Sequence, residues 1–125
     1  DPSGEAGKAL RAAKEQWRQR DRDAALRELR AAVACDPAAL EPRMQFVKWV
    51  SETAALFRDR DMCAEAAAVG RPAAEANPTN GELWYHYVNV LYGSKQREAA
   101  DEAKARCLAI RPRDPFSESC GYLPQ

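Results

Sequence analysis

The sequence predicts an all-α protein, and three observations carry that prediction. Ala is the most frequent residue and Arg, Glu and Leu are abundant, and all four lose little side-chain freedom in a helix. Val, Ile, Thr and Phe, which favour strands, are sparse and scattered. The eight Pro and six Gly fall mostly between candidate helices, where they act as breakers. We therefore expect helices and no sheet.

The segments between these breakers predict six helices. Their expected ranges are 4–20, 22–35, 43–58, 61–76, 80–93 and 95–110. Asp61 is expected to cap the fourth helix, and either Thr79 or Asn80 the fifth, because short polar side chains satisfy the first free backbone N–H groups. In the third helix, Phe46 and Trp49 are expected in the core.

Proline positions add three local expectations. Pro42 lies at the first turn of the third helix, where a missing N–H is harmless. The segment Gly70-Arg71-Pro72 should kink or split the fourth helix. Residues 113–125 contain Pro115, Gly121 and Pro124, and we expect no good helix there.

A recurring spacing divides the chain into three repeats. Each repeat ends in a proline that follows a helical run, at Pro37, Pro78 and Pro112. Small residues lie twelve and five positions before each proline: Ala25 and Ala32, Ala66 and Ala73, Ala100 and Cys107. The last two prolines are 34 residues apart, and the first two are 41 apart, which is longer by one heptad. Three matches to one pattern indicate a repeated helix pair.

This period and pattern resemble the tetratricopeptide repeat, in which W-x2-L-G-x2-Y precedes A-x3-F and a terminal P. The last repeat fits best, through Trp84 and the large residues after it and through Ala100, Cys107 and Pro112. It departs from the family with Val88 where Gly is usual and Lys104 where an aromatic residue is usual. The first repeat matches mainly in its second helix, and the middle one has a degenerate first helix.

The resemblance implies a right-handed α-solenoid of three antiparallel helix pairs over residues 1–112. The repeats would cover approximately 4–37, 42–78 and 79–112, with 113–125 as a C-terminal tail or cap. One helix pair cannot bury its apolar stripe alone, so neighbouring pairs stack and share a core.

The resemblance also implies a binding groove lined by the first helix of each pair. In helix 80–93, Tyr85, Asn89 and Tyr92 lie on one stripe, with His86 beside the packing stripe of Trp84, Tyr87, Val88 and Leu91. The repeat register places Leu10, Lys14 and Trp17 at equivalent positions in the first helix. Aromatic side chains supply buried area, and Asn can bond a peptide backbone. Alternatively, Trp17 and Tyr92 pack on the adjacent second helix as ordinary core.

The expected function is therefore protein–protein interaction: binding of a peptide segment or a partner helix, as an adaptor or within a larger assembly. A self-associating structural subunit is the alternative, and an enzyme using Cys with His86, the single His, is a third. The family's clamp for C-terminal carboxylates is not expected, because Leu10, Glu82 and His86 stand where cations are needed.

Other classes of function are disfavoured by composition. Nineteen basic and nineteen acidic residues give zero net charge, which disfavours nucleic-acid binding. No run of 18 apolar residues appears, so direct membrane insertion is not expected. The absence of Cys-x2-Cys pairs and of a Gly-rich phosphate loop predicts no metal and no cofactor.

The four Cys leave two alternatives open. Cys35 and Cys107 lie in apolar or small-residue positions that suit buried free thiols, which favours a cytoplasmic protein. In an exported protein an even count allows pairing, and Cys107–Cys120 is then favoured because the tail folds back where a next helix would pack. Cys35 and Cys63 would lie at opposite ends of a long helix, about 20 Å apart. No basic segment followed by an apolar one opens the sequence, so no signal peptide is visible.

Overall fold

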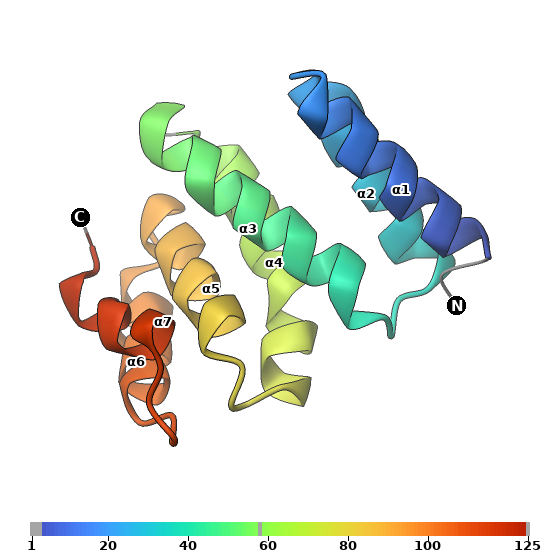
Figure 1. The fold of residues 1–125 in the computed structure, drawn as a ribbon. Coiled ribbons are helices and arrows are strands. Elements are labelled where there is room, and N and C mark those ends of the chain that lie inside the picture. The colour runs from blue at the N-terminus through green and yellow to red at the C-terminus, as the bar shows by residue number, and fades with distance from the viewer. Residues whose placement is uncertain (1–3, 58, 125) are drawn as a thin grey trace. The chain divides into compact units, whose positions relative to one another are not determined.

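The structure is a computed structural model that describes residues 4–57 and 59–124, and regular secondary structure within them is entirely helical (Figure 1). The helices are α1 (Glu5–Arg18), α2 (Arg22–Cys35), α3 (Leu40–Phe57), α4 (Arg60–Ala76), α5 (Gly81–Gly93), α6 (Arg97–Leu108), α7 (Pro115–Ser119) and the 3-10 helix η1 (Cys120–Tyr122). The all-α prediction is confirmed. Three predicted boundaries lie outside the described residues: residue 1 at the start of the repeat region, residue 58 at the end of the third helix and residue 125 at the end of the tail.

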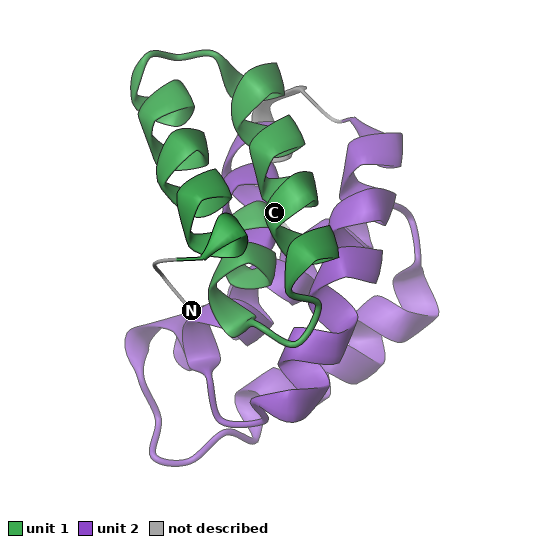
Figure 2. Ribbon diagram, turned by 90° about the vertical axis from the view of Figure 1, so that its right-hand side faces the viewer, with its two compact units in different colours: residues 1–46 green, residues 47–125 purple. Residues whose placement is uncertain are grey.

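The chain forms two compact units, residues 1–46 and 47–125, and α3 runs from the first into the second (Figure 2). No helix in the described parts, 4–57 and 59–124, is long and apolar enough to cross a bilayer.

In the first unit, α1 and α2 form a helix pair. The chain reverses at Arg20, which has a positive φ of 66°, and Asp21 then caps α2 by accepting a hydrogen bond from the Ala24 N–H at 3.1 Å. Ala13 and Leu29 are fully buried in this unit. Phe46 is also buried, as predicted, and the Arg30 guanidinium lies 5.5 Å from its ring centre.

In the second unit, α5 is the central helix. It contacts α4, α6 and α7, and Figure 1 shows α5 and α7 in the near layer with α4 and α6 behind them. The predicted packing stripe of α5 is buried: Trp84, Tyr87, Val88 and Leu91. Trp49 on α3 is also buried, as predicted.

The six small residues of the repeated spacing are all buried. Their exposed fractions are 5% or less: Ala25, Ala32, Ala66, Ala73, Ala100 and Cys107. A side chain no larger than a methyl or thiol group lets a neighbouring helix approach closely. Gly70 extends this principle, because a Cβ there would lie 2.5 Å from Val47 Cγ2 on α3. The helices of the second unit are therefore spaced by the size of these residues.

Two expectations about α4 are corrected. The helix begins at Arg60, and its cap is Asp59, which accepts a hydrogen bond from the Met62 N–H at 3.0 Å; Asp61 lies inside the first turn. Of the two expected effects of Gly70-Arg71-Pro72, a kink or a split, the split is wrong, because α4 runs as one helix through Pro72 to Ala76. Pro72 itself is exposed, while its neighbours Ala73 and Ala74 are buried, so packing holds the helix together on either side of the missing N–H.

The N-terminal caps of α5 and α7 are local features. Asn80, rather than Thr79, caps α5 by accepting from the Leu83 N–H at 3.1 Å. The expectation that the tail forms no helix is wrong, because Asp114 and Ser117 make a reciprocal capping box that starts α7. Pro115 occupies the first helical position, where it needs no N–H partner.

We predict that Ala100→Leu lowers the free energy of unfolding by about 1–3 kcal/mol, because Ala100 is fully buried and a larger side chain forces the helices apart. The matched change Ala105→Leu, at an exposed position of the same helix, should alter it by less than about 0.5 kcal/mol. Urea unfolding followed by circular dichroism measures both. Equal stability of the two variants would contradict the role assigned to the small position.

Candidate functional site

The predicted groove residues of α5 contact different neighbours: Tyr85 contacts α7, Asn89 contacts the second-unit part of α3, and Tyr92 contacts α6. Tyr85, Asn89 and Tyr92 are each half-buried. The Tyr85 ring stands edge-on to the His86 ring, with the centres 5.1 Å apart. It also lies 6.0 Å from the ring of Phe116 on α7. The tail thus covers part of the face on which Tyr85 lies.

Ser51 on α3 joins two of these residues. The Asn89 side-chain amide donates to Ser51 Oγ at 2.8 Å and to the Ser51 carbonyl at 3.3 Å. The His86 Nδ1 atom lies 2.8 Å from the same hydroxyl. Ser51 and His86 are buried, with exposed fractions of 3% and 6%. This network holds α5 against α3, and it leaves His86 as a packed side chain rather than a lining residue of an open surface.

The chemistry of His86 follows from that burial. Burial, and to a smaller extent the positive charge of Lys48, lowers the pKa of His86 to about 4. His86 is therefore neutral at pH 7. Its ring also lies 6.0 Å from Phe116, so an imidazolium would be poorly solvated there.

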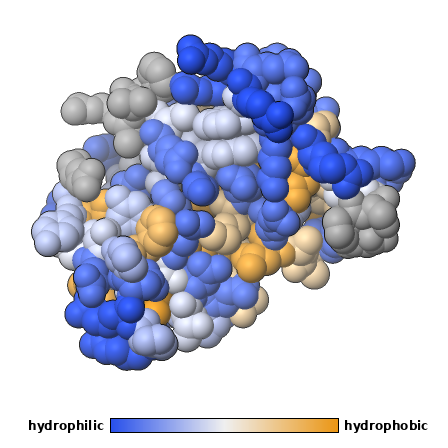
Figure 3. Space-filling view, viewed as in Figure 1, coloured by the Kyte–Doolittle hydropathy of each residue, from blue (hydrophilic) through white to orange (hydrophobic). Residues whose placement is uncertain are grey.

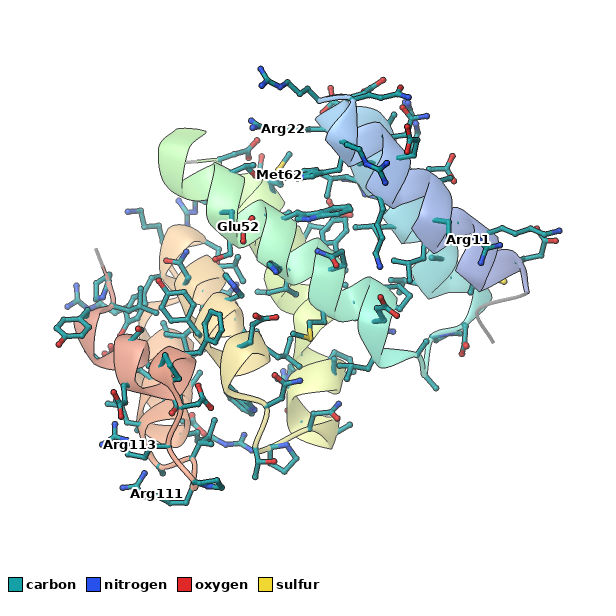
Figure 4. The ribbon with its side chains drawn as sticks, in the orientation of Figure 1. Arg11, Arg22, Glu52, Met62, Arg111 and Arg113 are labelled. Atoms are coloured by element: carbon teal, nitrogen blue, oxygen red, sulfur yellow. A yellow bond between two sulfur atoms is a disulfide. The ribbon has the colours of Figure 1, made fainter. Side chains whose placement is uncertain are left out.

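Trp17 and Tyr92, for which packing in the core was the alternative prediction, each contact the second helix of their own pair. The Tyr92 hydroxyl donates a hydrogen bond to Asp101 on α6 at 2.5 Å. The Trp17 ring lies 5.4 Å from the guanidinium of Arg22 on α2, a residue labelled in Figure 4. These contacts favour the packing interpretation for part of each side chain, although both remain half-exposed.

The other two predicted residues of α1 belong to the first unit. Leu10 is half-buried. Lys14 is exposed, and its amino group lies 3.0 Å from the Glu41 carboxylate at the start of α3. An exposed ion pair of this kind contributes little to stability. Lys14 is therefore held in place but accessible.

The tail is fixed by one covalent and several non-covalent contacts. Cys107 on α6 and Cys120 form a disulfide, the pairing favoured from the sequence, and both residues are fully buried. Lys104 donates a hydrogen bond to the Leu123 carbonyl at 2.7 Å. Lys104 is one of the two residues, with Val88, at which the last repeat departs from the tetratricopeptide pattern. Its role and that of Phe116 depend on where the tail lies, which no local pattern indicated.

Asp114 provides a further contact between the tail and α5. A Cβ on Gly81, the first residue of α5, would collide with both carboxylate oxygens of Asp114. Only glycine allows this approach, and a carboxylate at a helix N-terminus interacts favourably with the helix dipole. Arg111 and Arg113 lie in the same loop and are exposed (Figure 4), and the Arg111 guanidinium donates hydrogen bonds to the carbonyls of Leu108 and Ile110 at 3.0 and 2.9 Å.

A cleft of about 360 Å³ lies on the other side of α5, between α4 and α6. We call it the α4–α6 cleft and define it by the residues that line its floor and walls: Trp84, Tyr87 and Leu91 on α5, Ala68 and Arg71 on α4, and Ala99, Glu102, Ala103 and Arg106 on α6. The Arg106 guanidinium lies 4.5 Å from the centre of the Trp84 ring. No pattern in the sequence indicated this cleft, because it combines buried and exposed positions of three helices.

The two Cys outside the disulfide are free. Cys35 is exposed, which corrects the expectation of a buried position, because it ends α2 where the chain turns. Cys63 is buried, and burial, followed by the nearby Asp59 charge, raises the pKa of its thiol. In the described ranges, 4–57 and 59–124, no group of three or more His, Cys, Asp or Glu side chains is arranged to hold a metal ion.

Comparisons with protein-family models, with curated proteins and with solved structures find no match to this chain. On the face of the molecule shown in Figure 3, hydrophilic residues predominate and apolar ones form small separate patches. The functional argument therefore begins from the contacts described above.

We predict that stability falls as the pH drops from 6.5 towards 4. The pKa of His86 is lower in the folded state than in the unfolded chain, so the unfolded chain binds the proton more tightly in this window. The free energy of unfolding should be highest above pH 6.5 and lower by up to about 3 kcal/mol at pH 4. Urea unfolding at several pH values measures it, with His86→Gln as the control. The same pH slope in both proteins would contradict the assignment to His86.

We also predict that reduction of the disulfide with dithiothreitol lowers the free energy of unfolding by about 3 kcal/mol. The 13-residue separation of Cys107 and Cys120 defines a short closed loop, whose constraint on the unfolded chain is lost on reduction. A Cys107→Ala/Cys120→Ala double variant should then show no further response to dithiothreitol. A response of the double variant equal to that of the wild type would place the effect elsewhere.

Proposed function

We propose that this chain is a right-handed α-solenoid of three helix pairs, similar to tetratricopeptide repeats, and that it acts as a protein–protein interaction module. The repeats are residues 4–37, 42–78 and 79–112, and residues 113–125 form the cap. Its ligand is a peptide segment or a helix of a partner protein, and its role is that of an adaptor or of a part in a larger assembly. The proposal assigns the chain no catalytic step.

One observation carries the proposal: the small residues that recur with each repeat are all buried. Buried positions at a fixed spacing in each of three helix pairs are what a repeat architecture requires, because each pair must approach its neighbours in the same way. A spacing that merely reflected an Ala-rich composition would leave some of these positions exposed, as Ala99 and Ala105 are on α6. Repeat architectures of this kind commonly present a binding groove.

The face of α5 that carries Tyr85 supports a binding role for that side of the molecule. It already accepts one short helix, α7, through the contact of Phe116 with Tyr85. Half-buried aromatic rings contribute a large contact area without a large loss of side-chain entropy. We propose that a partner binds to the exposed part of the Tyr85 side chain and to the neighbouring Asn89.

Self-association is a second candidate function, and the exposed aromatic residues of the tail favour it. Tyr122 is 76% exposed and Phe116 is 37% exposed. Large exposed aromatic side chains are frequent in protein interfaces. In this alternative the tail of one molecule binds a second copy.

We predict that Tyr85→Ala loses a protein partner that the wild type retains, because it removes the aromatic ring at the centre of the proposed site. The measurement is capture from native lysate on the immobilised chain, followed by the dissociation constant of the purified partner. We expect a loss of at least about tenfold in affinity for an anchoring aromatic residue. The broader Tyr85→Ala/Asn89→Ala/Tyr92→Ala variant should lose the partner completely, provided that circular dichroism shows it to be folded.

Tyr122→Ala is the matched control, since it removes the same ring from the tail. A partner held equally by wild type and Tyr85→Ala would contradict the site. Sedimentation at increasing protein concentration separates the two candidate functions. A mass that rises with concentration in the wild type and not in Tyr122→Ala, without any partner, would replace the adaptor role by self-association.

A further inference from the structure

Tyr87, a largely buried residue of the α4–α6 cleft, carries a hydroxyl that has no hydrogen-bond partner among the described residues and is open to the cleft. Tyr87 is only 8% exposed, and its ring stands edge-on to Trp84 with the centres 5.6 Å apart. Within residues 4–57 and 59–124, the hydroxyl makes no hydrogen bond. Every fully enclosed side-chain nitrogen or oxygen in those residues does have a partner. The Tyr87 hydroxyl must therefore open into the cleft that it lines.

A hydroxyl that opens into a cleft favours a polar group in whatever displaces the water there. Burial raises the pKa of Tyr87, and the surrounding charges act in both directions, so the side chain is a neutral phenol near pH 7. A phenol both donates and accepts a hydrogen bond, as a peptide group does. Water pairs with this hydroxyl in the free protein, so a ligand that displaces the water without replacing its hydrogen bond loses affinity, whereas a peptide group replaces it.

The walls and rim limit what else the ligand can be. The walls next to Tyr87 are Ala68 on α4 and Ala99 and Ala103 on α6, which leave room for one apolar side chain. The rim carries two cations and two anions, so it attracts neither a polyanion nor a polycation. Arg71 pairs with Glu75 at 3.0 Å, and Arg106 lies over Trp84.

We propose that the α4–α6 cleft binds an uncharged stretch of a partner polypeptide, with one large apolar side chain between the Ala walls and a peptide group on the Tyr87 hydroxyl. This inference rests on the proposed function and gives it a second binding face. The side chain packs on Trp84 and Leu91. The peptide group replaces water at Tyr87. The cleft is on the opposite side of α5 from Tyr85, so the two faces are independent.

The probe is N-acetyl-phenylalaninamide, which carries one aromatic side chain between two peptide-like groups and has no charge. Amide NMR spectra of the full chain during its titration should show saturable shifts at Leu91, Ala99 and Ala103, with a dissociation constant in the millimolar range. N-acetyl-glycinamide, which has the same polar groups without the side chain, should give no saturable shift. Phenylacetate, which has the ring and a negative charge but no peptide group, should bind at least about fivefold more weakly.

Three variants test the individual contacts. Tyr87→Phe removes only the hydroxyl and should weaken binding about fivefold. Ala99→Leu, at an exposed wall position, fills the cleft and should weaken it by more than about tenfold. Ala105→Leu, the same change on α6 outside the cleft, should leave the affinity unchanged. Well-dispersed spectra establish that each variant is folded. If Tyr87→Phe is not folded, the affinity of Ala99→Leu alone decides whether the probe binds in the cleft.

Three results would overturn the inference. The first is the absence of saturable shifts at the cleft, and the second is unchanged affinity in both Tyr87→Phe and Ala99→Leu. The third is a set of shifts confined to Tyr85 and Asn89, which would support the proposed function while rejecting the second face. Failure of the proposed function is separate, because it is measured by partner capture with Tyr85→Ala.

Discussion

Close approach of helix backbones is the constraint on which the remaining features of this protein depend. Where Ala66, Ala73 and Ala100 are buried, the contact distance between helices is set by a methyl group, and at Gly70 by a hydrogen atom facing Val47. Such contacts gain dispersion energy from many atoms at once and cannot accept an added methylene group without displacement of a helix. Small residues therefore define the geometry, while Leu and Trp side chains fill the space that this geometry leaves.

Helix α5 shows how one element can serve two surfaces. It is apolar almost all round, as expected of a helix with neighbours on several sides. Towards α3 it presents His86 and Asn89 to Ser51, a polar contact that is fully paired and therefore compatible with burial. Towards α4 and α6 it presents Trp84 and Tyr87, and there the Ala side chains of the neighbouring helices are too short to cover the Tyr87 hydroxyl. The α4–α6 cleft is thus bordered by short Ala side chains at other positions than the repeated small residues: Ala68 on α4 and Ala99 and Ala103 on α6.

The tail illustrates how a terminal helix is protected without another complete pair. Three different interactions act on it: the Cys107–Cys120 disulfide, the hydrogen bond from Lys104 to Leu123 and the aromatic contact of Phe116 with Tyr85. Each is made by a different part of the tail, so none of them alone determines its position. Such contacts keep the apolar part of a terminal helix from water where no further helix packs against it.

The sequence by itself determined the helical class, the six main helices, the packing stripe of α5 and the burial of the repeated small positions, because periodicity and breakers act over a few residues. It also favoured the Cys107–Cys120 pairing once the tail was assumed to fold back. Tertiary structure decided that Asp114 and Ser117 start a helix in the tail, that Pro72 leaves α4 unbroken, that Cys35 is exposed and that His86 is buried. It alone decided the Ser51–His86 contact, which joins residues 35 positions apart, and the α4–α6 cleft, which is built from three helices. The physical reason is that such contacts depend on how helices pack, and the preferences of neighbouring residues along the chain carry no record of that packing.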